Sequence, residues 1–315
     1  MISVAMALYN STRFIEEQLD SIRNQTGPVD EVIMIDDCSS DGTVEWVREY
    51  INKYNLNNWK VECHDENKGY IDTFYDAIGK CSGDIIILCD HDDVWLKDKV
   101  GIIKKAFTQK KDMLMLATSF EQIDEDGRNV PIKLKRGHAN NNLIRRSVQK
   151  GAMNKMDFYD IATYNLSPGC TCAISSNIKK SILNTKSILP HDWALSVMAA
   201  LDDGLYYFDC VTTKYRIYDK NTIGLGHERR FENRKKIVQN NYFEKKATLN
   251  LVYSKKGKQS KEYKYSARLL KVFRMRSLAM KNRNPLIIIS ALIKSIGLDH
   301  LYESVLMDFV TIVKF

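Results

Sequence analysis

The sequence predicts an α/β fold in which helices cover a doubly wound, mostly parallel sheet, followed by a helical extension at the C-terminus. In the first hundred residues, short β-branched apolar runs alternate with segments of helical spacing. Polar clusters follow three of these apolar runs, as expected where parallel strands end at a ligand site. From Phe231 onward the composition changes to helix rich in Lys and Arg. With 315 residues and 44% hydrophobic content, the chain can bury a large core.

Each element of the first hundred residues follows from its own pattern. Apolar, β-prone runs predict strands at 2–8, 32–35, 60–63 and 85–89. Apolar residues at helical spacing predict helices at 13–24, 44–52 and 70–81. Strands separated by helix-length segments pair in parallel, so their carboxyl ends meet at one edge of the sheet. We therefore expect the polar clusters at 9–10, 36–37 and 90–93 to lie together.

The middle of the chain is less regular. Residues 117–213 mix short strands with loops, and the polar and glycine-containing segments at 140–142 and 151–157 are typical of a mobile excursion. A Ser-Pro-Gly turn then leads into an apolar run, which predicts another buried strand at 170–174.

Residues 90–93 place three carboxylates, those of Asp90, Asp92 and Asp93, directly after a buried strand. Carboxylates held this close repel one another, and they need a cation or strong donors to stay ionised together. A divalent hard cation with oxygen ligands meets that need and indicates phosphate chemistry. Alternation along an extended segment would point Asp90 and Asp92 to one side, and His91 and Asp93 to the other. The alternative is a turn capped by exposed acids.

Charge and targeting patterns limit the partners and the compartment. Residues 228–283 hold 18 Lys and Arg but only 4 acidic residues, which favours a membrane, a nucleic acid or an acidic polymer as partner. No nucleic-acid recognition module accompanies this charge. The seven cysteines lack zinc-type pairing, and neither a signal peptide nor a membrane-spanning apolar run is seen. We expect a cytoplasmic protein that is peripheral on the inner face of the cell membrane if its basic segment binds lipid.

Six motifs, taken in order, resemble the family 2 glycosyltransferases of the GT-A fold, and in particular the bacterial rhamnosyltransferase-like enzymes that build surface polysaccharides. The motifs lie at 3–10, 32–43, 67–69, 90–95, 191–193 and 215–222. A single D-x-D triplet is a weak signal, whereas the ordered set is specific. Neither a G-x-G-x-x-G fingerprint nor a P-loop sequence is present, which excludes Rossmann dinucleotide binding and P-loop phosphate binding.

The resemblance implies a nucleotide-sugar site at the strand ends. Tyr9 and Asn10 would line the base and ribose pocket, and Asp37 would accept a hydrogen bond from the pyrimidine base. Asn67 would lie near the donor sugar and diphosphate. The residues themselves leave other roles open, because Asp37 could cap a helix and Asn10 could be a plain turn residue.

The resemblance also implies a metal. Asp90 would face the ribose or the metal, and Asp92 would bind the Mg²⁺ or Mn²⁺ that bridges the two phosphates. The subgroup has a His between its Tyr-Arg and Asn-Thr pairs that contributes to the metal or diphosphate site. In this chain Tyr218 takes that position, so metal binding would be weaker or His227 would substitute.

On the acceptor side, Asp192 in the His-Asp-Trp motif matches the family's catalytic base. An inverting transfer needs a carboxylate to take the proton of the acceptor hydroxyl as the anomeric carbon is attacked. Pro190 predicts a turn that presents Asp192 at a helix start, where an N-cap is its alternative role. Gly169 and Trp193 are expected beside the acceptor and Arg216 on the diphosphate. A turn glycine and an ion pair within the fold are the alternatives for Gly169 and Arg216.

These inferences predict a GT-A catalytic domain at 1–227, with a nucleotide-binding half at 1–100 and an acceptor half at 101–227. A basic helical region would follow at 228–315. Within it, 255–283 is expected to form an amphipathic basic helix that contacts an anionic membrane surface, unless it packs on the catalytic domain.

The expected function is an inverting, metal-dependent sugar transfer from a nucleoside diphosphate donor, either dTDP-rhamnose or a UDP-sugar. The acceptor would be a saccharide or a lipid-linked saccharide in surface polysaccharide synthesis. The alternative is a catalytically silent GT-A module that binds glycan or tethers an assembly.

Overall fold

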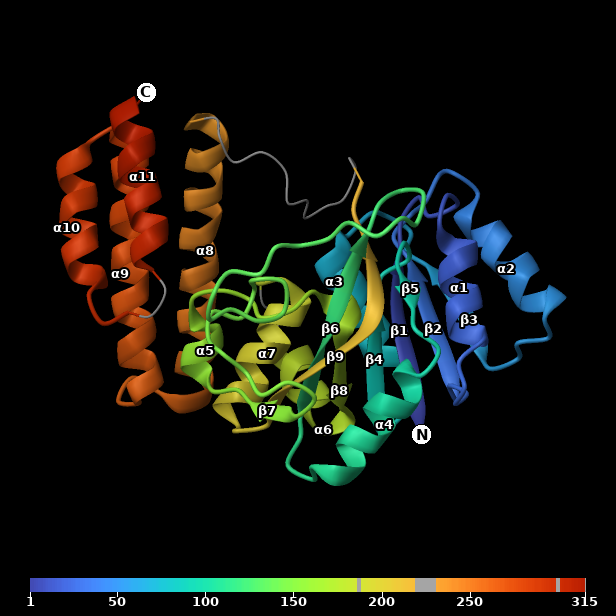
Figure 1. The fold of residues 1–315 in the computed structure, drawn as a ribbon. Coiled ribbons are helices and arrows are strands. Elements are labelled where there is room, and N and C mark those ends of the chain that lie inside the picture. The colour runs from blue at the N-terminus through green and yellow to red at the C-terminus, as the bar shows by residue number, and fades with distance from the viewer. Residues whose placement is uncertain (186–187, 219–230, 299–300, 315) are drawn as a thin grey trace.

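A computed structural model describes residues 1–185, 188–218, 231–298 and 301–314, and within them one nine-stranded sheet forms the centre of the molecule (Figure 1). The strands are β1 (Ile2–Leu8), β2 (Glu31–Asp36), β3 (Trp59–Cys63), β4 (Ile85–Cys89), β5 (Val94–Trp95), β6 (Met115–Ile123), β7 (Met153–Lys155), β8 (Cys172–Ser175) and β9 (Leu205–Arg216). The helices are α1 (Ile15–Arg23), α2 (Thr43–Lys53), α3 (Tyr70–Lys80), α4 (Lys99–Gln109), α5 (Phe158–Ala162), α6 (Ser176–Thr185), α7 (His191–Leu201), α8 (Phe231–Lys256), α9 (Lys261–Asn282), α10 (Pro285–Ser295) and α11 (Tyr302–Lys314).

The first half of the sheet is wholly parallel. Neighbouring strands in the order β3-β2-β1-β4 run in the same direction, and Met6 of β1 lies opposite Met34 of β2 and Cys89 of β4. β1 is buried along its whole length, as expected for a strand with helices on both faces. The predicted strands and helices of this half are confirmed, and their carboxyl ends share one edge of the sheet.

The second half of the sheet is mixed. β8 runs antiparallel to β4 and β6, β6 and β9 are parallel, and β5 and β7 pair antiparallel with β9. The predicted doubly wound α/β sheet with a C-terminal helical extension is therefore confirmed, with its parallel pairing concentrated in the first half.

Two hydrophobic cores flank the sheet because successive side chains of each strand point to opposite faces. Met6 of β1 packs on one face, in the core that holds Leu19 of α1. Ala5 packs on the other, in the core that holds Ile78 of α3. This second core continues through α7 into the C-terminal helices, so the sheet and the helical extension share buried side chains.

The excursion predicted at 151–157 is only partly irregular, because residues 153–155 form β7. Met153 lies opposite Phe208 and Lys155 opposite Tyr206, so this segment adds an edge strand to β9. Residues 153–155 contain no β-branched run that would predict a strand. Backbone pairing with the long β9 stabilises β7 instead. Residues 140–142 do form a turn, in which all three asparagines have a positive φ.

The C-terminal region differs from its prediction. Residues 255–283 form not one helix but the end of α8, a turn and the whole of α9. Leu269, Val272 and Phe273, three of the apolar residues expected to face lipid, are buried in the core between the helices. The apolar side of α9 is therefore used for packing within the molecule, the alternative that the composition had left open.

α11 is joined to the rest of the bundle by a buried ionic cluster. Asp308 is fully buried, and its two carboxylate oxygens accept from Nε of Arg234 on α8 at 2.7 Å and Nε of Arg276 on α9 at 2.6 Å. Ser304, one turn earlier, accepts through its Oγ from Arg276 at 2.7 Å. These contacts fix which side of α11 faces inward.

The predicted boundary at residue 227 lies outside the described residues. The helices on either side of it touch directly, since Nζ of Lys245 on α8 lies 3.8 Å from the centre of the Trp193 ring on α7. Among the described helices, each is too short or too polar to span a bilayer.

Candidate active site

The carboxyl edge of the parallel half gathers the polar clusters, as predicted. β1 ends at Leu8, β2 at Asp36 and β4 at Cys89, and the clusters at 9–10, 36–37 and 90–93 follow directly. Because β1 pairs in parallel with both β2 and β4, the three clusters lie on neighbouring strands at the same edge.

Asp37 is buried, and its carboxylate is engaged with the loop after β3. The backbone N–H groups of Lys68 and Gly69 donate to it at 2.8 Å, and Nδ1 of His64 lies 3.0 Å from Oδ1. Burial raises the pKa of Asp37, but the hydrogen bonds from His64, Lys68 and Gly69 outweigh it, so the pKa lies below its ordinary value. Asp37 therefore organises this loop, and hydrogen bonding to a nucleotide base stays a prediction.

The other expected nucleotide contacts surround Asp37. Asn10 has a positive φ of 47°, and its Oδ1 accepts from the backbone N–H of Ser40 at 3.0 Å, which matches the turn role. Asn67 donates through Nδ2 to the backbone oxygen of Asp37 at 3.1 Å. Tyr9 is about half exposed at the end of β1, so its ring faces solvent at the predicted nucleotide site.

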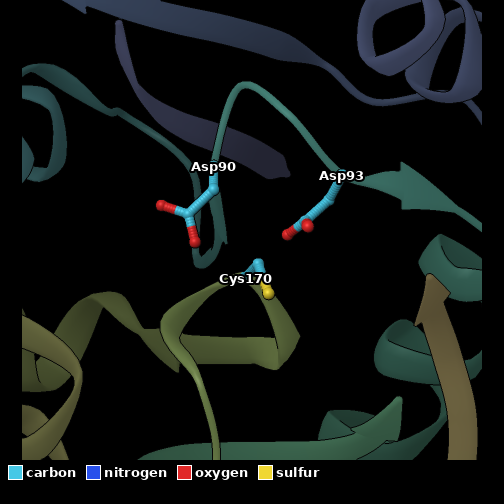
Figure 2. A group of neighbouring side chains, drawn as sticks. All are labelled: Asp90, Asp93 and Cys170. Carbon is cyan, nitrogen blue, oxygen red and sulfur yellow. The ribbon is translucent and has the colours of Figure 1, made fainter. Parts of the chain in front are cut away.

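The acid turn at 90–93 brings together a different pair from the one expected. One carboxylate oxygen of Asp90, one of Asp93 and Sγ of Cys170 all lie within 4.8 Å of one another. Figure 2 shows Asp90 and Asp93 at the two ends of the turn, with Cys170 facing them from the segment before β8. The chain bends at His91 and Asp92, so the extended alternation expected for this segment does not hold. Metal binding by Asp92 stays a prediction.

The carboxylates of this turn carry uncompensated charge. Burial and then the neighbouring Asp93 and Asp92 raise the pKa of Asp90 well above its ordinary value. Burial and Asp92 likewise raise the pKa of Asp93 to about 7. Lys99 is buried nearby, but its Nζ donates to the backbone oxygen of Cys170 at 2.6 Å and to Thr213 at 2.9 Å. That cation is therefore hydrogen-bonded to neutral groups.

These residues fit a divalent cation. Oδ1 of Asp93 accepts from the backbone N–H of Arg216 at 2.9 Å, whereas its Oδ2 is buried without a hydrogen-bond partner. Two hard oxygen donors with repelling charges are what Mg²⁺ and Mn²⁺ bind. The Cys170 thiol suits neither ion, and burial raises its pKa well above the ordinary value, so it stays protonated.

Asp192 lies in the first turn of α7 and is 7% exposed. Its Oδ1 accepts from the backbone N–H of Trp193, and its Oδ2 accepts from Nδ2 of Asn165, both at 2.8 Å. Burial raises the pKa of Asp192 to about 6, although these donors and the N–H of Gly169 lower it. Pro190, and not Asp192, takes the N-cap position. The carboxylate is thus held in place and poised to take a proton near neutral pH.

Gly169 has a packing reason that the sequence could not show. A Cβ at this position would lie 2.7 Å from Nε2 of His191. The His191 ring stacks on Phe74 with a centroid distance of 3.7 Å, and burial lowers its pKa to about 3, so it is neutral. The glycine therefore admits a histidine ring. Its expected place beside the acceptor sugar stays a prediction.

Trp193 is also a core residue, and its expected place beside the acceptor stays a prediction. The side chain is 5% exposed, its Nε1 donates to the backbone oxygen of Ile161 at 2.9 Å, and Lys245 covers its ring. Its position holds α7, and with it Asp192, against α5 and α8.

Arg216 is 1% exposed, and its guanidinium is committed to the fold. Nε donates to the backbone oxygen of Asp92 at 2.8 Å, and Nη1 donates to those of Asp124 and Glu125 at 3.2 Å. Nη2 forms an ion pair with Glu17. These contacts correct the expected diphosphate contact and match the alternative of an ion pair within the fold. Arg216 holds the acid turn from behind.

Tyr218, at the position where the subgroup has His, contacts the acid turn as well. Its side chain is hydrogen-bonded to Asp92, and burial followed by the charge of Asp92 raises its pKa. The ring also meets Phe14 edge to face at a centroid distance of 5.1 Å. The Asn-Thr pair at 221–222 and His227 lie outside the described residues.

Three contributors to the site were missed by sequence reasoning. His64 bridges two carboxylates, with Nδ1 3.0 Å from Asp37 and Nε2 2.9 Å from Asp76. Asn165 orients Asp192, and Cys170 faces the acid turn. His64 could have been found, because it directly follows β3 at the same edge of the sheet. Asn165 and Cys170 belong to segments whose fold depends on the antiparallel half.

Comparisons with known proteins agree with this geometry. The family model "Glycosyl transferase family 2" matches residues 3–166, just over half of the chain. RfbG of Shigella flexneri, named a dTDP-rhamnosyl transferase, is 28% identical over 77% of this chain and 82% of its own length. TuaG of Bacillus subtilis, named as a glycosyltransferase of teichuronic acid biosynthesis, is 28% identical over 40% of this chain. That match spans about half of TuaG.

Solved structures show the same fold. TarS of Staphylococcus aureus in complex with UDP-GlcNAc superposes with a TM-score of 0.58 at 18% identity, covering 99% of this chain and 90% of that one. The mannosyltransferase PcManGT of Pyrobaculum calidifontis, in complex with GDP-Man and Mn²⁺, gives a TM-score of 0.56 at 14% identity, covering 99% and 84%. The predicted GT-A fold is confirmed.

Proposed function

Because the chain belongs to glycosyl transferase family 2, we propose that it catalyses an inverting, metal-dependent transfer of a sugar from a nucleoside diphosphate donor to a saccharide hydroxyl. The observation that carries this proposal is the meeting of an acid turn and a single buried carboxylate. Gly169 lies against Asp192, and the next residue, Cys170, lies against Asp90 and Asp93. A metal-binding edge and a base are thus joined through two consecutive residues.

Asp192 is the proposed catalytic base. Its carboxylate would accept the proton of the acceptor hydroxyl while the oxygen attacks the anomeric carbon from the face opposite the departing diphosphate. The hydrogen bonds from Trp193 and Asn165 fix the carboxylate, so little reorganisation is needed when the proton is transferred. A raised pKa makes Asp192 a stronger base than an ordinary aspartate while leaving it mostly ionised at neutral pH.

Asp90 and Asp92 remain the metal ligands proposed from the sequence, and we add Asp93, whose carboxylate lies close to that of Asp90. A bound Mg²⁺ or Mn²⁺ would neutralise the charge that develops on the departing diphosphate. Arg216 and Tyr218 are assigned to positioning, because the first holds the backbone of the turn and the second hydrogen-bonds to Asp92. Tyr9, Asn10, Asp37 and Asn67 are proposed to surround the nucleotide.

The donor proposal is dTDP-rhamnose or a UDP-sugar. RfbG, which matches most of this chain, is named for the first, and the TarS structure that shares its fold holds the second. The proposed acceptor is a saccharide or lipid-linked saccharide of a surface polysaccharide; among the relatives, TuaG is named for the biosynthesis of teichuronic acid. We propose a catalytic region up to residue 227, with the helical region after it.

Replacing Asp192 by Asn tests the proposal against a catalytically silent GT-A module. The assay follows release of dTDP or UDP from dTDP-rhamnose or UDP-GlcNAc with Mn²⁺ and a mixture of saccharide acceptors. An enzyme should lose 10²–10⁴-fold, about what general base catalysis supplies. Its thermal protection by the nucleotide sugar should persist.

Asp203→Asn is the matched control, since Asp203 is an exposed residue just beyond the same helix and has a positive φ of 63° that Asn tolerates. Equal turnover by the two variants would refute Asp192 as the base. A wild-type chain that binds the nucleotide sugar but never releases nucleoside diphosphate would favour the silent module.

A further inference from the structure

The outer side of the C-terminal bundle carries an apolar face that no part of the described chain covers. On α10 and just after it the exposed apolar residues are Leu286, Ile289, Ile293 and Ile296, and on α11 they are Leu306, Met307, Val310 and Val313. We name these eight residues the α10–α11 face. Leu286 is 71% exposed, Ile293 63% and Val313 62%, values typical of polar surface residues. Monomeric soluble proteins rarely present so many apolar side chains together.

We propose that this face binds a membrane surface that contains anionic lipid. The proposal goes beyond the proposed function and does not depend on it, because it concerns residues outside the candidate active site. It keeps the cations of 255–283 but moves the apolar contact from α9 to α10 and α11, because Leu269, Val272 and Phe273 of α9 are buried.

Helical spacing places each half of the face on one side of its helix. Leu286, Ile289 and Ile293 recur at intervals of three and four, and so do Leu306, Val310 and Val313. α10 and α11 pack against each other. The orientation of α11 is fixed, because buried arginines bind Asp308 and Ser304 on its inner side. The apolar residues on its other side therefore point outward.

A basic stripe on α9 adjoins the face. Its exposed cations recur at intervals of three, four or seven residues, namely Lys261, Lys264, Arg268, Lys271, Arg274 and Lys281. Within the described part of the chain, Lys264, Lys271 and Arg274 form no ion pair with an acidic side chain. Arg268 donates to the backbone oxygen of Ile296, which connects the stripe to the end of α10.

The combination of basic and apolar side chains distinguishes among three possible binding partners of this face. An acidic polymer would pair with the basic stripe but would leave the apolar residues in water. A second copy of the chain would bury the apolar residues but would bring two basic stripes together. Among the described residues of α10 and α11, Glu303 is the one exposed acid, so little opposes an anionic surface. A bilayer interface takes apolar side chains below its headgroups and attracts cations at them.

Vesicle sedimentation with the full chain tests the proposal. Vesicles of phosphatidylcholine alone are compared with vesicles of phosphatidylcholine and phosphatidylglycerol at a ratio of about 7 to 3, near the anionic charge at which juxtamembrane cations bind. Partitioning should be at least about tenfold stronger on the anionic vesicles. K271Q/R274Q should lower it roughly 25-fold, since each cation near an anionic surface contributes about fivefold. Ile293→Ser should lower it about tenfold through lost apolar burial.

Matched controls come from the same chain. K104Q/K105Q removes two exposed cations from α4, and Ile188→Ser removes an exposed isoleucine before α7; both should bind like the wild type. Equal binding to the two vesicle types, or equal losses in the controls, would overturn the proposal. A wild-type dimer in sedimentation velocity that Ile293→Ser converts to monomer would assign the face to a second copy instead. Thermal protection by nucleotide sugar should be unchanged in every variant, so failure of this proposal and failure of the proposed function are separately visible.

Discussion

Two of the places where the described chain shields carboxylates from water treat the negative charge in opposite ways. In the C-terminal bundle, Asp308 is fully buried between the guanidinium groups of Arg234 and Arg276, with both oxygens within 2.7 Å of a donor nitrogen. At the edge of the sheet, Asp90 and Asp93 face each other across an acid turn, and the pKa values of both are raised by burial and by neighbouring carboxylates.

The difference separates structure from function. Removing a carboxylate from water is costly, and a fold recovers that cost only when it supplies counter-charges with good geometry. The bundle supplies two, so Asp308 belongs to the architecture. Among the described residues, the sheet edge supplies no ion-pair partner to Asp90 or Asp93, because the buried Lys99 is hydrogen-bonded to neutral groups. A charge that the fold leaves uncompensated in this way marks the place of a cationic ligand.

Replacing Asp308 by Asn should produce the largest effect on stability. It removes the buried carboxylate that pairs with two buried guanidinium groups, which should lower the free energy of unfolding by about 3–5 kcal/mol. Urea unfolding followed by circular dichroism measures the loss. Asp202→Asn, which removes the partly exposed partner of Lys255, is the control and should cost about 1 kcal/mol or less. Similar losses in the two variants would show that Asp308 is not a structural counter-ion.

Binding of Mn²⁺ at the acid turn should raise the free energy of unfolding, whereas Asp308→Asn lowers it. At a free Mn²⁺ concentration about 100-fold above its dissociation constant, the native state should gain about 2.7 kcal/mol, and EDTA should reverse it. Differential scanning fluorimetry across a Mn²⁺ series gives the constant. Asp90→Asn should weaken the response, whereas Asp308→Asn should leave it intact in the fraction that remains folded. A melting temperature that is independent of Mn²⁺ would show that the acid turn does not bind the ion and does not differ from Asp308 in this respect.

Replacing Asp93 by Asn should stabilise the protein when no metal is present, the opposite sign from Asp308→Asn. The amide oxygen can still accept from the backbone N–H of Arg216, while the repulsion from Asp90 and Asp92 disappears. The expected gain is roughly 1–2 kcal/mol, well below the full effect implied by the raised pKa, because the site relaxes. Chemical unfolding in EDTA measures this gain in the free energy of unfolding. Destabilisation as large as that of Asp308→Asn would show that Asp93, like Asp308, is a structural carboxylate.

The pH dependence of turnover should report Asp192, the third buried carboxylate. A base must be ionised to accept a proton, and burial raises the pKa of Asp192 to about 6. Turnover should therefore fall as the pH drops through 6, approaching a tenfold loss per pH unit, or about 1.4 kcal/mol. A pH series of the transfer rate at saturating donor shows this limb. A limb near 4, as for a solvated aspartate, would contradict the burial seen at α7.

The first half of the fold could be predicted because its signals are local. Each of β1, β2 and β4 is an apolar run bounded by turn residues, and parallel pairing then dictates that Asp37 and Asp90 share an edge. β7 could not be predicted, since its three residues have no strand pattern and depend on pairing with β9. Local sequence specifies elements well when they carry their own hydrophobic pattern.

The candidate site was predictable in its residues more than in its contacts. Motif order identified Asp90, Asp92 and Asp192. The bend at His91 brings the carboxylates of Asp90 and Asp93 together, and residue types alone do not predict how a turn bends. Arg216 matched a motif position, yet its buried guanidinium donates to the backbone oxygens of Asp92 and Asp124 and pairs with the Glu17 carboxylate. Whether a polar side chain faces a ligand or its own fold is set by tertiary packing, which spacing alone does not determine.

The contact between Lys245 and Trp193 joins the C-terminal bundle to the part of the chain that holds Asp192. Trp193 is the residue after Asp192, and Lys245 of the C-terminal bundle covers its ring although the lysine is itself almost fully buried. A recombination that joined this catalytic region to a different tail would uncover the indole beside Asp192. The bundle is therefore not an interchangeable appendage. A substitution of Lys245 on α8 would therefore alter the packing around α7 and Asp192.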